Sequence, residues 1–162
     1  MSFDNADKRT RRDFLIGAAQ IAGGAGLVVM VPCSGSRASP DALQAAIRKV
    51  VGDAPLRKGR VTLGIPAMVE NGNTVSVEIN VESPMTAADH VKAIHLLNEK
   101  NPLPNVLSVR LGPHAGKAEV STRIRLATTQ QVMAIAEMSD GTFWSDTSDI
   151  FVALAACQED PG

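Results

Sequence analysis

Strict alternation of apolar and polar side chains runs along the stretch Val75-Ser76-Val77-Glu78-Ile79-Asn80-Val81-Glu82. Successive side chains of a β-strand point to opposite faces, so this alternation predicts a strand with one buried and one solvated face. Such strands are typical of antiparallel sheets, because parallel sheets are usually covered on both faces. The stretch therefore indicates an all-β fold.

The same period of two continues on both sides of this stretch. Val61, Leu63 and Ile65 alternate before it, and residues 118–126 alternate after it. The Asn71-Gly72 pair between the first two stretches tolerates positive φ and predicts a tight hairpin. A second hairpin is predicted between residues 106–111 and 118–126, with its turn at residues 112–116.

The remaining strands are predicted from shorter patterns. Residues 132–138 are apolar on both faces, which predicts a central strand. Asp140-Gly141 predicts a turn into residues 142–144, and a last alternating strand covers residues 150–154. Residues 93–98 fit either a helix or a strand, and Thr86 and Asp89 are spaced to cap a short helical turn. About seven short strands at regular spacing predict an immunoglobulin-like antiparallel β-sandwich over residues 61–154.

One helix is expected before the strands. Ser39 is a good N-cap, Pro40 suits the first helical position, and Asp41 places an acid in the first turn. Apolar residues then recur at helical spacing from Leu43 until Gly52. Residues 39–60 are therefore expected to form an amphipathic helix and a polar connector.

The N-terminal residues resemble a Tat export signal. Arg11-Arg12 precedes an uncharged run over residues 14–31, whose many Gly and Ala residues are typical of a signal peptide. Ser36-Arg37-Ala38 is similar to a cleavage site. We expect residues 1–38 to be a Tat signal peptide and the protein to be periplasmic. The alternatives are a membrane anchor over the apolar run and a lipoprotein attached through Cys33.

Charge and cysteine content limit the partners of the remaining chain. Residues 39–162 hold 11 Lys and Arg against 14 Asp and Glu, a net charge near −3. Nucleic acid and anionic membranes attract basic surfaces, so neither is an expected partner after cleavage. Cys157 is the one cysteine of this segment. A single thiol in an exported protein suggests a reactive or intermolecular role, and the alternative is a small residue packed at a strand end.

Few other residues suggest chemistry. His90, His95 and His114 do not have the spacing of a metal-ligand set, and we expect neither a metal nor a cofactor. Phosphate-loop and nucleophile-elbow motifs are missing from the sequence, so the case for a catalytic site is weak. Arg123 and Arg125 would hold an anion or a partner carboxylate, or simply be solvated. Phe143-Trp144 is either an interface anchor or core.

Several separated motifs resemble the SoxY family, the sulfur-carrier subunits of the bacterial thiosulfate-oxidising Sox system. The resemblance covers residues 60–157. The motifs are Glu70-Asn71-Gly72-Asn73, Ser83-Pro84-Met85, Asn101-Pro102 with Pro104, residues 123–130 and residues 138–144.

The resemblance implies an immunoglobulin-like domain that pairs with a SoxZ-like subunit and a C-terminal arm whose cysteine bears sulfur intermediates. Cys157 occupies the position of that cysteine. The family arm is Gly-Gly-Cys-Gly-Gly, whereas residues 155–162 of this chain place Ala155, Ala156, Gln158 and Glu159 at the glycine positions. The family also implies a cytochrome, a hydrolase and a sulfane dehydrogenase as partners, and these perform the catalysis.

The sequence therefore favours a non-catalytic carrier of thiosulfate-derived sulfur that acts through Cys157. One alternative is an assembly or binding subunit of the same family with impaired or lost carriage. The other is a thiol oxidoreductase using Cys157, for which the sequence offers neither a resolving cysteine nor a nearby histidine.

Overall fold

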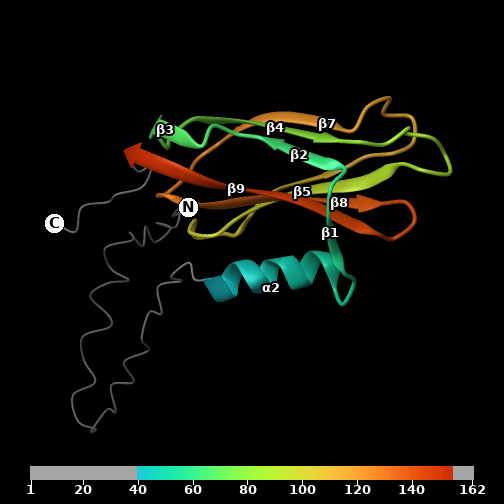
Figure 1. Ribbon diagram of the computed structural model, residues 1–162, viewed down its shortest axis with the longest axis horizontal. Helices are drawn as coiled ribbons and strands as arrows, with labels where there is room; N and C mark the ends of the chain where they lie inside the picture. The colour runs from blue at the N-terminus through green and yellow to red at the C-terminus, as the bar shows by residue number, and fades with distance from the viewer. Residues whose placement is uncertain (1–39, 155–162) are drawn as a thin grey trace, which may run out of the picture. The chain divides into compact units, whose positions relative to one another are not determined.

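The computed structural model describes residues 40–154 (Figure 1). Within this range one helix precedes nine strands. They are α2 (Pro40–Val51), β1 (Leu56–Lys58), β2 (Val61–Gly64), β3 (Met68–Asn71), β4 (Val75–Val81), β5 (Val91–Asn98), β6 (Asn105–Arg110), β7 (Glu119–Ile124), β8 (Gln130–Met138) and β9 (Phe143–Leu154).

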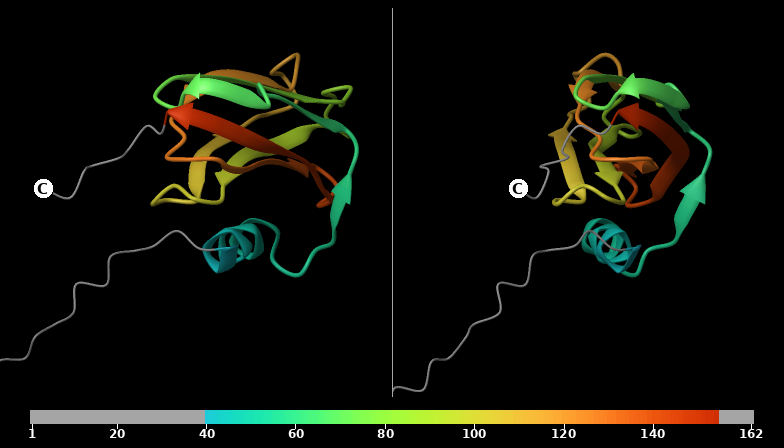
Figure 2. Two further views of the ribbon diagram at one scale, coloured as in Figure 1. Left: turned by 60° about the vertical axis from the view of Figure 1, so that its left-hand side comes forward. Right: turned by 90° about the vertical axis from the view of Figure 1, so that its left-hand side faces the viewer.

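The strands form two sheets packed face to face, and the predicted immunoglobulin-like sandwich is confirmed (Figure 2). The larger sheet has the order β1-β9-β8-β5-β6, with β3 also paired to β9, and the smaller sheet has the order β2-β4-β7. Strand β4 shows the predicted alternation, because its apolar residues are buried and its polar residues are exposed. The core between the sheets is aliphatic, with Ile79, Ile94, Leu96 and Leu126 among its fully buried side chains.

Helix α2 packs on the outer face of the larger sheet, as Figure 1 shows. Its buried residues Leu43 and Ile47 form a second apolar cluster with Leu97 of β5 and Ile135 of β8. The helix ends at Val51, and Gly52 takes a φ of 61°, a left-handed conformation that glycine adopts without strain. The predicted amphipathic helix is confirmed.

The hairpin predicted at Asn71-Gly72 is wrong. Strand β2 does pair antiparallel with β4, but β3 lies between them in the chain and pairs in parallel with β9. The turn therefore carries the chain from the larger sheet to the smaller one, and Gly72 does not adopt positive φ. Its N–H donates to the carbonyl of Leu154 and its own carbonyl accepts from the N–H of Leu126, each at 2.9 Å. These two bonds connect the ends of the two sheets.

The second predicted hairpin is also wrong. Strand β6 pairs with β5 and β7 pairs with β4, so residues 111–118 cross from one sheet to the other. The Asp89 N–H donates to the Thr86 hydroxyl at 3.1 Å, but the predicted helical turn does not form. The ambiguous residues 93–98 belong to strand β5, and residues 142–154 contain one continuous strand, β9.

The sequence patterns predict neither β1, which lies in the connector, nor β3. Both β1 and β3 are short, largely exposed and paired in parallel with β9. Neither carries a period of two, because neither has a fully buried face.

Candidate functional site

The predicted attachment residue Cys157 and the arm residues Ala155, Ala156, Gln158 and Glu159 lie outside the described residues, which end at Leu154. The predicted signal peptide, with Cys33, also lies outside them. The part of the candidate site that the structure describes is the base of the arm, where β9 ends.

Hydrogen bonds of its backbone hold the end of β9 from two sides, to the backbone of β3 and its preceding residue on one side and to a side chain on the other. On one side it pairs with β3, where Met68 is in register with Phe151 and Asn71 with Leu154. The Phe151 N–H donates to the Ala67 carbonyl at 2.8 Å. On the other side the Val152 N–H donates to the Thr129 hydroxyl at 3.0 Å. The end of β9, after which residues 155–162 follow in the sequence, is therefore held in place.

A shallow cavity of about 290 Å³ lies beside Phe151. Its charged groups are Glu99, Lys100 and Asp149. Lys100 Nζ donates to the Thr129 carbonyl at 3.0 Å, and Gln131 Nε2 donates to Asp149 Oδ1 at 3.1 Å. Two carboxylates and one ammonium group give this cavity no excess of positive charge for a sulfur oxyanion.

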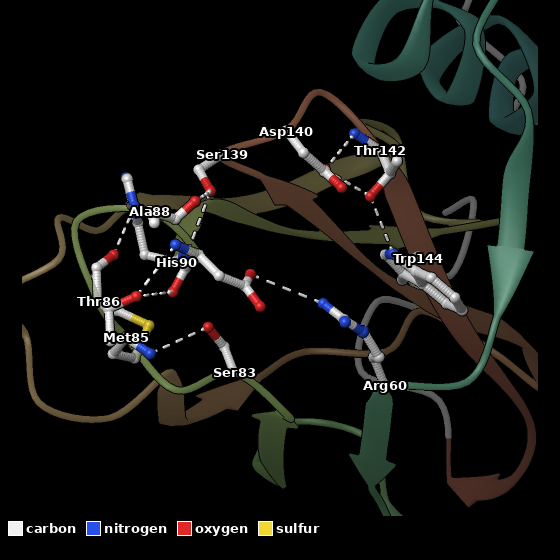
Figure 3. A network of polar contacts seen from close by, with 11 residues as sticks. Arg60, Ser83, Met85, Thr86, Ala88, His90, Ser139, Asp140, Thr142 and Trp144 are labelled. Carbon is white, nitrogen blue, oxygen red and sulfur yellow. Dashed lines mark hydrogen bonds and ion pairs between the residues drawn. The ribbon is translucent and has the colours of Figure 1, made fainter.

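A polar network lies near the start of β9, at the other end of that strand (Figure 3). Asp140 accepts from the Thr142 N–H at 2.9 Å and from the Thr142 hydroxyl at 2.7 Å, and these hydrogen bonds lower the pKa of Asp140. Trp144 Nε1 donates to the same hydroxyl at 3.1 Å, and Arg57 and Arg60 lie over the indole ring. These groups satisfy one another, which indicates a structural role.

Loop 83–90 joins the same network. The His90 N–H donates to the Ser139 hydroxyl at 3.1 Å, and that hydroxyl donates to the Ala88 carbonyl at 3.2 Å. An ion pair at 3.8 Å links Arg60 to Asp89. The network thus ties the β4–β5 loop to the β8–β9 turn and to the residues before β2.

The two aromatic residues considered as an interface anchor are half-buried. Trp144 packs against the core between the sheets, and Phe143 packs against the cluster under α2. Both therefore fill the core. Arg123 and Arg125 are exposed, and no ion pair involves either of them among the described residues. The exposure of both side chains agrees with the alternative in which Arg123 and Arg125 are simply solvated.

The three histidines do not form a common site. Within residues 40–154 no group of three His, Cys, Asp or Glu side chains is placed to hold a metal ion. His95 lies half-buried on β5, where its Nδ1 is 2.9 Å from the Ser108 hydroxyl. Burial lowers the pKa of His95, while Glu137 raises it and Arg110 lowers it.

His95 is expected to make stability depend on pH. Because its pKa is lower in the folded state, the unfolded chain binds more protons below its ordinary pKa of about 6.5, and stability falls as pH drops through that value. His95→Gln should flatten the dependence of the melting temperature on pH between about pH 5 and pH 7. The same change at exposed His114 controls for the loss of a histidine. An unchanged slope in His95→Gln would contradict the prediction.

No helix in the described range is both long and apolar enough to cross a membrane.

Comparison with known proteins gives one family match. The model of the family described as sulfur oxidation protein SoxY matches residues 47–157. No curated protein matches the chain.

Several solved structures resemble the chain. The sulfur carrier protein SoxY from Chlorobium limicola f thiosulfatophilum is 25% identical, with a TM-score of 0.59 and coverage of 70% of this chain and 98% of that chain. Superoxide reductase (neelaredoxin) from Ignicoccus hospitalis is 20% identical, with a TM-score of 0.52 and coverage of 58% and 80%. Superoxide reductase from Nanoarchaeum equitans is 13% identical, with a TM-score of 0.50 and coverage of 59% and 100%. The two reductases share the fold alone.

Proposed function

The chain belongs to the SoxY family of sulfur oxidation proteins, and from this premise we propose that it carries sulfur intermediates of thiosulfate oxidation covalently on the thiol of Cys157. The observation that carries the proposal is the extent of the family match, which continues past the last strand to residue 157. The likeness to a solved sulfur carrier over 98% of that chain supports it.

The chemistry requires a thiol that is presented away from the domain. A cytochrome partner would join thiosulfate to Cys157, so that the S–H bond is replaced by an S–S bond, one proton is released and two electrons pass to the cytochrome. A hydrolase would then add water, release sulfate and leave a persulfide on Cys157. A sulfane dehydrogenase would then oxidise the outer sulfur of the persulfide to a sulfonate with oxygen from three waters, passing six electrons to its own electron acceptor. Hydrolysis of the remaining S–S bond would release a second sulfate and restore the thiol of Cys157. The chain itself serves as the scaffold on which these enzymes act.

A second function is favoured by the arm sequence. Ala155, Ala156, Gln158 and Glu159 replace glycines of the family arm. Alanine has less conformational freedom than glycine, and the charge of Glu159 repels a thiosulfate dianion. An assembly subunit with impaired carriage would have such an arm.

One experiment separates these functions. The chain is co-expressed with the SoxZ-like subunit of the same organism, and sedimentation is expected to show a one-to-one heterodimer. The pair is then incubated with the Sox cytochrome and thiosulfate, and its intact mass is measured. A gain of one S₂O₃ unit on Cys157 supports carriage. An unmodified thiol in a correctly paired complex supports the assembly subunit, and thiol–disulfide exchange by the unpaired chain supports the oxidoreductase.

We also propose export to the periplasm by the Tat pathway. Arg11 and Arg12 form the twin-arginine pair that this pathway requires. Replacing both with Lys is expected to leave the precursor in the cytoplasm, as measured by immunoblotting of cell fractions. Arg9→Lys, a change of the same kind outside the pair, should leave export intact. Normal periplasmic accumulation of the double variant would exclude the Tat pathway.

A further inference from the structure

Exposed apolar side chains gather where the arm leaves the domain. Four large apolar side chains of the described range are strongly exposed, namely Met68, Leu103, Phe151 and Leu154. Three of them, Met68 at 70%, Phe151 at 52% and Leu154 at 66% exposure, lie on the paired strands β3 and β9 (Figures 1 and 2). We call Met68 and Phe151, which share one face of these strands, the arm-root patch. Leu154, three residues after Phe151, has the opposite parity along β9 and is not part of it. Clustered exposed apolar residues mark interaction sites, whereas single ones are common everywhere.

The pairing of β3 with β9 fixes the geometry of the patch. Met68 and Phe151 are in register, so their side chains project side by side from the outer face of the larger sheet. Their neighbours Val69 and Val152 point inward and pack against the core. Leu154 is the last residue of β9, and its carbonyl is held by Gly72. The patch is therefore preformed on strands and needs no rearrangement to bind.

Acidic groups flank the apolar pair. By alternation, Glu70 shares the outer face with Met68, and Asp149 shares it with Phe151. Both acidic residues are exposed, and neither has an ion pair among the described residues. Glu99 and Lys100, which also lie beside Phe151, have opposite charges, so the surroundings of the patch are acidic on balance and complement an apolar surface bordered by basic side chains.

The length of the arm indicates what covers the patch. Cys157 follows Leu154 by three residues, and three extended residues span only about 10 Å. An enzyme that takes the thiol into a recessed active site must therefore bring its surface within that distance of Leu154. Met68 and Phe151 lie on the same strand ends, so they meet the same surface.

We infer that the arm-root patch is the docking surface for the partner enzymes that act on Cys157, and that the rim of their active-site entrance is apolar and bordered by basic residues. This inference rests on the proposed carrier function. A permanent subunit must leave the patch free, because otherwise an enzyme could not reach a thiol on so short an arm.

The test compares adduct formation in matched variants of the complex with the SoxZ-like subunit. Met68→Ser combined with Phe151→Ser is expected to slow the cytochrome-dependent mass gain on Cys157 by about tenfold or more, because buried apolar anchors dominate docking energies. The reaction of Cys157 with a small disulfide reagent should not change. Leu103→Ser, at 76% exposure in the loop between β5 and β6, is the control and should load at the parent rate.

A longer arm provides a second test. Six Gly and Ser residues inserted after Leu154 let the thiol enter an active site without contact between the two domains. The rate penalty of the double variant is therefore expected to shrink in the long-arm background. An undiminished penalty would contradict docking through the patch.

The outcomes separate this inference from the proposed function. If the parent complex never gains an adduct, the carrier function fails and the docking surface fails with it. If the parent loads and the double variant loads equally fast, only the docking surface is excluded. If the double variant instead fails to pair with the SoxZ-like subunit, the patch is the heterodimer interface and the inference is wrong.

Discussion

Cys157→Ser is expected to remove every sulfur adduct from the chain and to abolish thiosulfate-dependent growth. A serine hydroxyl forms no stable bond to the outer sulfur of thiosulfate, and residues 39–162 contain no second thiol to replace it. The measurements are the intact mass of the heterodimer after incubation with thiosulfate and the Sox cytochrome, and growth of the complemented strain on thiosulfate.

Cys157→Ser should remove sulfur attachment without changing the stability of the chain or its pairing. Cys157 follows the last strand of the described range, so the melting temperature and the pairing with the SoxZ-like subunit are expected to equal those of the parent. Cys33→Ser is a matched control, because Cys33 lies in the predicted signal peptide and should be absent from the exported chain. Adducts or thiosulfate-dependent growth that persist in Cys157→Ser would contradict the carrier proposal.

The fold class could be predicted because one face of β4 is buried and the other is solvated. The same logic identified β8 as a central strand, since both of its faces are covered by apolar groups. The pairing of the strands on either side of a turn is harder to predict. Local sequence shows where a chain reverses, but it does not show which sheet the next strand joins. This is why the local sequence at Asn71-Gly72 and at residues 112–116 predicts hairpins, although both segments connect the two sheets.

The candidate site is also only partly predictable from the sequence. Cys157 is singled out by the sequence as the one thiol of residues 39–162, its carrier role comes from the family motifs, and the structure does not describe it. The exposure of Phe151 follows from the alternation of β9, in which Ile150 and Val152 on either side face inward. Met68 was not predicted, because it neighbours Phe151 only through a parallel pairing between residues 83 positions apart in the chain. No local periodicity records such a contact.

Leu96→Ala is expected to cause the largest loss of stability of the changes considered. Leu96 is fully buried on β5, where it lies between Ala134 of β8 and Leu107 of β6. Because Ala134 is small, its side chain cannot extend into the space that the leucine leaves. Removing a buried leucine side chain costs about 2–5 kcal/mol, a large part of the roughly 5–15 kcal/mol that stabilises a typical domain.

The measurement is the urea midpoint of unfolding, and Leu103→Ala is the matched control. It removes the same atoms from a side chain that is 76% exposed, so it should change the unfolding free energy by no more than about 0.5 kcal/mol. Similar losses from the two variants would contradict the placement of Leu96 between the sheets. A large loss from Leu96→Ala alone agrees with the observed register of β5, in which Leu96 faces the core between the two sheets. That register places Leu97 under helix α2, so a single strand joins the two apolar clusters into one domain.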